Sequence, residues 1–330
     1  MLKKNMPCRA KSDCGAETRT IARKRRFMFP LLAAAALLTL CAACSKRSDD
    51  ESDQMEGKAE AKKALGLFEI PGDPSDLTVK LSGNVNLELV KVEAGTFEMS
   101  ARDGENYNDE VPHQVTLKHD FYIGRTEVTQ AQWLAVMRIE LSYFTGDDLP
   151  MENVSWYDAM EFCEKLNDMG KAPKGWRFTL PTETQWEYAA RGGKKSKGYK
   201  YSGSNNIDEV AWCIALLPGA SSGSVFDESV LDYEHASGTQ PVGRKKPNEL
   251  GLYDMSGNVW EWCLDDWQKK SDKLTAEFTR GSNREDAARA DRGGSWFELA
   301  WDCRSASRDY FDPGYRDRDL GFRVALVPVR

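Results

Sequence analysis

Short runs in which apolar and polar residues alternate begin near residue 81 and continue through much of the chain. Residues 87–92 and 113–118 alternate as half-buried strands do, and residues 120–123 are expected to continue the second strand beyond His119. After residue 193 the chain is rich in Gly, Asn and Trp, with loops and short strands in place of strand–helix alternation. The pattern predicts an α+β fold with few helices, short strands and much irregular structure, and it disfavours a doubly wound sheet.

Three helices are expected among these strands. Residues 127–137 carry a threonine cap and place Trp133, Val136 and Met137 on one face. Residues 155–158 open a second helix with apolar residues along one side. A third, short helix starts at residues 181–185 with a capping box, and two glycines at 192–193 end it.

The first 44 residues have the composition of an export signal. A basic stretch leads into an apolar run over residues 27–43, which is too short for a stable membrane span. Small residues precede Cys44 as in bacterial lipoprotein signals, so Cys44 is the predicted lipidation site, and an ordinary secretory peptide cut nearby is the alternative. Ser45, directly after Cys44, is not an acidic residue of the kind that retains a lipoprotein in the inner membrane. This favours anchoring in the outer membrane of the cell envelope. Residues 45–80 are expected to form a disordered tether, and residues 81–330 the folded domain.

Charge and cysteine content narrow the function classes. Without the signal the exported part keeps 36 basic and 50 acidic residues, a net charge near −14, so no nucleic-acid partner is expected. The four cysteines of the mature domain form no CxxC pair, which disfavours a zinc ribbon or a thioredoxin-like site. An oxidising compartment permits disulfides, but the sequence does not assign their pairing. These cysteines are Cys163, Cys213, Cys263 and Cys303.

Four motifs occur in one order along the chain. They are LPTETQWEYAARGG at 180–193, NELGLYDMSGNVWEW at 248–262, RGGSW at 292–296 and GFR at 321–323. Together they resemble the formylglycine-generating enzyme (sulfatase-modifying factor) family over roughly residues 86–328. The resemblance implies a C-type-lectin-like α+β fold. The tryptophans of these motifs, Trp186, Trp260, Trp262 and Trp296, are expected to pack in the core.

A calcium site is expected in the second motif. Asp254 and Glu261 offer carboxylates, and Gly257 and Val259 offer backbone carbonyls, from one tight turn. Hard oxygen ligands on a glycine-containing bend suit Ca²⁺, and the resemblance implies a structural calcium ion at the matching positions. The alternative is an ordinary turn with a solvated pair of acids.

The chemistry of the family depends, by the same resemblance, on two cysteines five positions apart that bind copper and oxidise a substrate cysteine to formylglycine. Glu298 occupies the first of these positions, and Cys303 falls at the second or matches a structural cysteine just downstream. A carboxylate is a poor ligand for soft Cu(I), so catalysis and copper are not expected. The alternative is a copper-dependent oxidoreductase in which Cys303 and another cysteine, such as Cys263, hold the metal.

The segment between Trp296 and Gly321 suggests binding. Its framework resembles the variable region of lipoproteins that a diversity-generating retroelement rewrites, and aromatic residues mixed with short polar ones are typical of recognition surfaces. The ligand is expected to be a protein or a small molecule at the cell surface; a solvated acidic loop, or a structural role in an envelope assembly, are the alternatives. The candidate surface residues are Phe297, Trp301, Asp309, Tyr310, Phe311, Tyr315 and Asp317.

Overall fold

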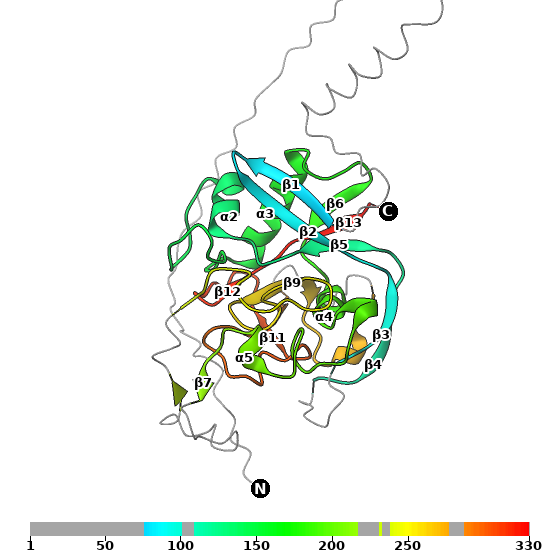
Figure 1. Cartoon of the computed structure of the whole chain (residues 1–330). Coiled ribbons are helices and arrows are strands. Elements are labelled where there is room, and N and C mark those ends of the chain that lie inside the picture. Colours follow the sequence, from blue (N-terminus) through cyan, green and yellow to red (C-terminus); the bar gives the residue numbers. More distant parts are fainter. Residues whose placement is uncertain (1–75, 101–108, 217–230, 233–237, 277–286, 330) are drawn as a thin grey trace, which may run out of the picture. The chain divides into compact units, whose positions relative to one another are not determined.

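The computed structural model describes residues 76–100, 109–216, 231–232, 238–276 and 287–329 (Figure 1). The predicted signal, the lipidation site Cys44 and most of the predicted tether lie outside these residues. Strand β1 spans Asp76–Ser82, so residues 76–80, which were predicted to be tether, belong to a strand. Leu77 and Val79 extend the inward-facing alternation N-terminally of Leu81, and they pair with Leu89 and Leu87 of the next strand.

A five-stranded sheet carries the two chain ends of the described domain. Its order is β1-β2-β5-β13-β6, and all four pairings are antiparallel. The other strands of this sheet are β2 Val85–Val92, β5 Phe121–Gly124, β6 Trp176–Thr179 and β13 Ala325–Pro328. Because β13 is inserted between β5 and β6, the C-terminal segment ties the early strands to the middle of the chain.

Two helices pack beside this sheet (Figure 1). Helix α2 spans Gln130–Met137 and α3 spans Trp156–Asp168, and each begins at a capping box, on Thr129 and on Ser155. The predicted apolar face of α2 is confirmed, since Trp133, Val136 and Met137 are its buried residues. A capped N-terminus satisfies backbone N–H groups that a helix otherwise leaves without partners.

The third predicted helix is confirmed as α4, Glu183–Ala190, with Thr182 and Gln185 forming the capping box. It contacts a second sheet in which β9, Trp260–Asp266, lies between β10 and β12. This four-stranded sheet has the order β11-β10-β9-β12, with β10 Arg289–Arg292, β11 Arg308–Phe311 and β12 Leu320–Gly321. Two two-stranded sheets complete the described strands: β3 Gly95–Met99 with β4 His113–Leu117, and β7 Ala215–Leu216 with β8 Leu231–Asp232.

One predicted strand is wrong in its extent. Strand β4 ends at Leu117, and β5 begins at Phe121 in a different sheet. Asp120 accepts a hydrogen bond from Ala94 N at 2.8 Å and pairs with Lys91 at 3.0 Å. These contacts of Asp120 hold a bend between the two strands, so the alternation of residues 113–123 is interrupted.

Buried ion pairs hold β10, β11 and the loop between them against α4 and the segment before β4. Arg308 donates to both carboxylate oxygens of Glu183, and Arg292 pairs with Glu187. Arg304 donates to both oxygens of Glu110, at 2.6 and 2.9 Å. Buried charges are tolerated only when they are paired and hydrogen-bonded, so these pairs specify where the loops between β10 and β12 lie.

No helix among the described residues is long and apolar enough to cross a membrane.

Candidate functional site

The RGGSW motif leaves β10 through two glycines in left-handed conformations, Gly293 with φ +102° and Gly294 with φ +74°. A Cβ atom on Gly294 would lie 2.7 Å from the sulfur of Cys303, so only glycine allows this approach. The next residue but one, Trp296, is held by its backbone N–H, which donates to Asn258 O at 2.8 Å. The motif therefore places Trp296 beside the turn of the second motif.

An aromatic cluster surrounds Arg318 at the surface beyond this motif. The ring centroids of Tyr143 and Phe144 lie 5.1 Å apart, those of Phe144 and Trp296 5.6 Å, and those of Trp296 and Phe297 5.2 Å. The guanidinium of Arg318 lies 5.4 to 5.7 Å from the centroids of Tyr143, Trp296 and Phe297, within reach of cation–π attraction. Tyr143 is 65 % exposed. We call these five residues the aromatic face.

Buried carboxyl groups support the aromatic face from below. Glu152, which is fully buried, accepts a hydrogen bond from Phe144 N at 2.9 Å, and its Oε2 atom has no partner. Burial raises the pKa of Glu152 to about 7. Asp319 accepts a hydrogen bond from Ser295 Oγ at 2.9 Å. Glu152 thus holds the loop before α3 together, and Asp319 ties the loop after β10 to the segment that precedes β12.

The predicted surface residues have different immediate partners. Phe297 belongs to the aromatic face, whereas the ring of Tyr310, 44 % exposed, stacks on Trp267 at 4.6 Å. Phe311 and Tyr315 stack on each other at 4.5 Å and pack against the main core. The other three, Trp301, Asp309 and Asp317, are half-buried. The prediction missed Tyr143, Phe144 and Arg318, the first two because they lie some 150 residues earlier in the chain.

Two thiols meet behind the RGGSW loop. Cys303 is fully buried, and the half-buried Cys213 packs against the same small cluster, where the two thiols interact. This contact lowers the pKa of Cys213, while the same contact and burial raise the pKa of Cys303. Glu298 lies close enough to raise the pKa of Cys303 further. Cys263, the cysteine suggested as a second metal ligand beside Cys303, packs in a different core cluster, with Trp186 and Ala290.

The residues predicted to bind calcium lie on one turn at the start of β9. Gly257 has φ +78°, and a Cβ atom there would lie 2.2 Å from Trp212 O. Asp254 is buried; its Oδ2 atom accepts a hydrogen bond from Gly243 N at 2.7 Å, and its Oδ1 atom has no partner. Glu261 is bound by Arg323 through both oxygens, at 2.6 and 2.7 Å, and by Trp186 Nε1 at 2.8 Å.

Charge around this turn is not balanced by the side chains present. Glu127 is fully buried, its Oε2 atom has no partner, and burial together with nearby Asp254 raises its pKa well above the usual range. Burial raises the pKa of Asp254 to about 6. Three carboxyl groups thus face two cationic side chains, Arg323 and Lys245, so the site can take protons or a cation. Asp254 Oδ1 fits a cation, but Glu261 would have to share its oxygens with Arg323. Among the described residues, no three or more His, Cys, Asp or Glu side chains are grouped as metal ligands.

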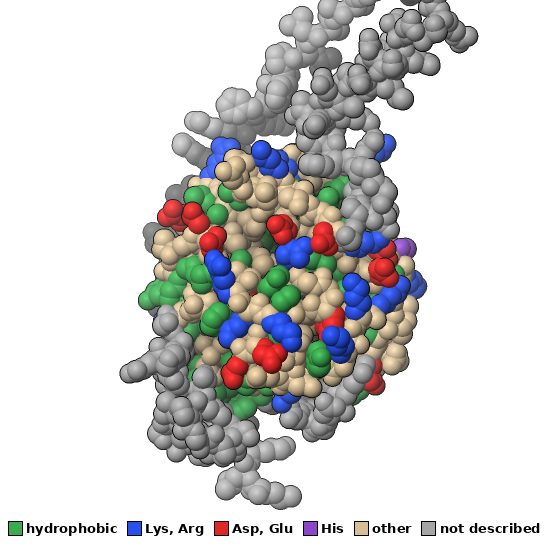
Figure 2. Space-filling model, in the orientation of Figure 1, with side chains coloured by type: hydrophobic (Ala, Val, Ile, Leu, Met, Phe, Trp, Pro, Cys, Tyr) green, Lys and Arg blue, Asp and Glu red, His purple; other side chains and the backbone are tan. Residues whose placement is uncertain are grey.

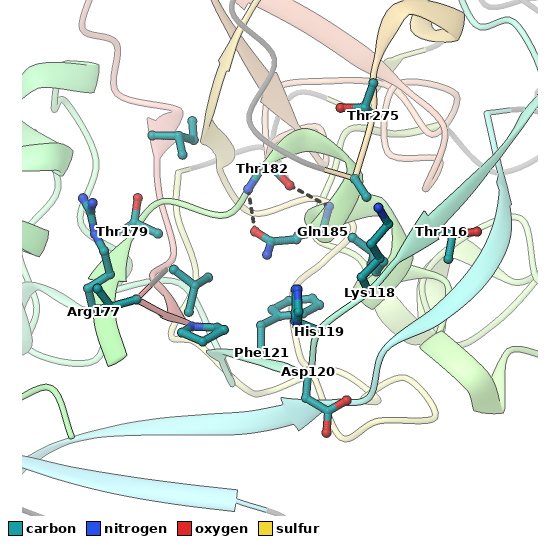
Figure 3. A pocket seen from close by; sticks show the side chains of 16 residues that line it. Thr116, Lys118, His119, Asp120, Phe121, Arg177, Thr179, Thr182, Gln185 and Thr275 are labelled. Carbon is teal, nitrogen blue, oxygen red and sulfur yellow. Dashed lines mark hydrogen bonds between the residues drawn. The ribbon is translucent and has the colours of Figure 1, made fainter. Parts of the chain in front are cut away.

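A cavity of about 770 Å³ lies elsewhere, where β5, β6 and β13 meet the start of α4 (Figure 3). Lys118, His119 and Arg177 are among its lining residues. Figure 3 also shows that Thr182 and Gln185 are hydrogen-bonded to each other by the helix cap, at 2.9 and 3.2 Å. None of the residues predicted from the sequence as site residues lines this cavity.

Residues 77–327 match the family of sulfatase-modifying factor enzyme 1-like domains. The chain belongs to this family. It is 37 % identical over 276 residues to "Chaperone protein LppX" of Paenibacillus barcinonensis, covering 74 % of this chain and 91 % of that protein. It is 33 % identical over 187 residues to the formylglycine-generating enzyme of Thermomonospora curvata, covering 54 % of this chain and 56 % of that enzyme.

The chain is similar to the solved structure of Treponema denticola variable protein 1, with a TM-score of 0.63 and 31 % identity. The similarity covers 78 % of this chain and 100 % of that one. The predicted family, the likeness to variable proteins and the C-type-lectin-like α+β fold are confirmed. The structure also identifies residues that the motifs did not single out. Cys213 and Glu127 come next to predicted site residues only through the fold, because their own sequence neighbourhoods carry no metal-binding or catalytic spacing.

Proposed function

We propose that the chain is an exported, lipid-anchored protein of the cell envelope whose domain binds a protein or a small ligand and does not oxidise cysteine. The aromatic face carries this proposal. Tyr, Trp and Arg are the residues most often found to dominate recognition. Tyr and Trp present large contact area at low cost in conformational entropy. Tyr143 and Arg318 are exposed, while Trp296 beneath them is 5 % exposed, so the face is both accessible and firmly supported.

The chemistry of the residues near Cys303 supports a non-catalytic role. Glu298 provides an oxygen donor at the position where the family's reaction needs a thiolate, and soft Cu(I) binds thiolates in preference to carboxylates. Cys303 itself is 0 % exposed, so a peptide substrate cannot reach it without movement of the loop.

The partner is expected to be neither a nucleic acid nor an acidic polymer. Figure 2 shows basic and acidic side chains interspersed on the face drawn, with no broad basic patch of the kind that binds a polyanion. The export signal, and an anchor at Cys44 in the outer membrane, rest on the sequence pattern of residues 1–44. The likeness to a variable protein and to a protein called a chaperone supports binding as the general activity.

Cross-linking the anchored protein in its native envelope, followed by identification of the cross-linked partner, tests the binding role. We expect one partner to be lost when the aromatic face is altered by Phe297→Ala or Tyr143→Ala. Tyr157→Ala is the matched control, because Tyr157 is also an exposed aromatic, 48 % exposed, but lies on α3 and meets the ring of Trp156 edge-on. Equal recovery of the partner from all three variants and the wild type would exclude the aromatic face as the binding site.

A copper-dependent oxidoreductase is the second candidate, and the contact between Cys213 and Cys303 is the observation that favours it. Two adjacent thiols could hold a soft metal ion. Incubation of the protein with copper, oxygen and a cysteine-containing sulfatase peptide decides between the two functions. We expect no aldehyde in the peptide; formation of formylglycine that is lost in Cys303→Ser would establish the oxidoreductase.

Calcium is proposed as a structural ion at the turn of the second motif. Asp254 through Oδ1, Glu261 and the carbonyls of Gly257 and Val259 would hold it. Such an ion, when bound, would offset the excess negative charge of Glu127, Asp254 and Glu261. The unpaired Oδ1 atom of Asp254 supports this assignment, because a buried carboxylate oxygen without a partner is costly.

A further inference from the structure

The two thiols that meet behind the RGGSW loop are unlike the other two of the described domain. Cys163 and Cys263 are each buried in apolar clusters, and burial raises the pKa of both. Cys213 and Cys303 instead contact each other in a small cluster with Tyr201 and Val210. All four are free thiols in this structure.

Backbone hydrogen bonds hold the two segments that carry this pair in a fixed relation. Ile214 N donates to Glu298 O at 2.8 Å, immediately beyond Cys213. Asn258 N donates to Trp212 O, and Trp296 N donates to Asn258 O, both at 2.8 Å. The two segments are therefore both bonded to the turn at Asn258. The two thiols are thus held in one cluster by segments that are bonded to each other, and such a fixed placement side by side is the first requirement of a disulfide.

The surroundings of the two sulfurs differ in a way that suits stepwise exchange. Cys213 is half-buried and open to a small reagent, while Cys303 is fully buried against Gly294. An accessible thiol can attack an external disulfide, and a buried thiol in contact with it can then resolve the product.

We propose that Cys213 and Cys303 form a modification site that closes into an intramolecular disulfide by exchange with a low-molecular-weight or protein disulfide. The Cys213 thiolate attacks one sulfur of the external disulfide, breaks its S–S bond and releases one thiolate. Cys303 gives its proton to that thiolate and attacks the sulfur of Cys213, releasing the second external thiol. Two electrons pass from the protein thiols to the external disulfide, which leaves as two thiols.

The cross-link has consequences for the neighbouring loops. It joins residue 213 to residue 303 and so constrains the unfolded chain over about 90 residues. It also pins the segment that follows the aromatic face, and it removes the thiol of Cys303 from any soft metal. That the protein meets an external disulfide depends on its export, which is part of the proposed function. The pairing of Cys213 with Cys303 depends only on the contact between the two thiols.

Peptide mapping of the full chain, purified without reductant and alkylated with N-ethylmaleimide, tests the proposal. After incubation with oxidised glutathione we expect a pair of peptides joined through Cys213 and Cys303. Cys163 and Cys263 are buried, so we expect N-ethylmaleimide to alkylate them only after the protein is unfolded. Reduction should lower the melting temperature by about 5–10 °C. In Cys213→Ser this difference should vanish, and in the control Cys163→Ser the joined peptides should persist.

Separate alkylation of Cys213 and Cys303 after this incubation would overturn the proposal, as would a lasting glutathione adduct on Cys213. The peptide map of the wild-type chain needs no variant, so it remains decisive even if Cys213→Ser folds poorly. The map also needs no binding partner. Failure of the disulfide and failure of the aromatic face to bind are therefore distinguishable results.

Discussion

Glu152 provides a direct test of how buried charge controls the stability of the aromatic face. Its carboxyl group is 0 % exposed and accepts a hydrogen bond from Phe144 N, while its Oε2 atom has no partner. Burial raises its pKa from 4.5 to about 7. A carboxyl group whose pKa is higher in the folded state favours folding at low pH, and this contribution is lost as the pH rises through the folded pKa.

The size of the effect follows from the two pKa values. They correspond to about 3 kcal/mol in the free energy of unfolding, of which about 2 kcal/mol is lost between pH 5 and pH 8. Glu152→Gln keeps an oxygen that can accept from Phe144 N and removes the ionisation. We therefore expect the variant to gain about 2 kcal/mol relative to the wild type between pH 5 and pH 8, or roughly 5 °C in melting temperature.

Urea unfolding at pH 5 and pH 8, followed by tryptophan fluorescence, measures this difference. Burial also raises the pKa of Asp254 to about 6 and that of Asp302 to about 7. The contributions of these groups to the pH dependence are the same in variant and wild type, so they cancel in the comparison. Glu140→Gln, at an exposed position of the preceding loop, is the control and should leave the difference unchanged. A Glu152→Gln protein with the same pH dependence as the wild type would refute this account of the buried carboxyl group.

Two further predictions concern buried acids. If Asp254 holds calcium, the melting temperature in 1 mM Ca²⁺ should be several degrees higher than in chelator, since an ion at about 100 times its Kd adds about 2.7 kcal/mol. Asp254→Ala should abolish this difference. The control Asp312→Ala, at an exposed position, should keep it. Asp291 is 0 % exposed, neither of its oxygens has a partner, and Asp309 lies opposite it on β11. Burial raises the pKa of Asp291 well above the usual range. Asp291→Asn should therefore increase the free energy of unfolding by about 1–3 kcal/mol, and the increase should be larger at pH 8 than at pH 5. A loss of stability of this variant in thermal unfolding would contradict the prediction and show that Asp291 has a role in folding.

The local structure of this protein follows closely from short stretches of sequence. The capping boxes at Thr129, Ser155 and Thr182 are complete within four residues each, and all three helices begin where they predict. The motif tryptophans are buried as expected, from 0 to 5 % exposed. Caps and apolar periodicity act between residues a turn or less apart, so the chain needs no distant contact to express them.

The order of the four motifs also determined the family and its fold. Each motif supplies a local feature, such as the left-handed glycines of RGGSW. The first strand was placed too late by the sequence, because the short run of residues 76–80 shows its alternation clearly only when paired with β2. The bend at Asp120 was missed for the same reason, since its contacts with Ala94 and Lys91 are tertiary.

The site itself was decided by the tertiary structure. Cys213 and Cys303 are 90 residues apart in the sequence. The aromatic face joins residues of three loops, which lie before α3, after β10 and before β12. Whether a carboxyl group such as Glu261 is free for a cation or bound by Arg323 depends on packing that brings residues 62 positions apart into contact. Residue type and spacing fix caps and turns because those interactions are local, whereas thiol pairs, cation–π contacts and buried charges depend on which distant loops the core brings together.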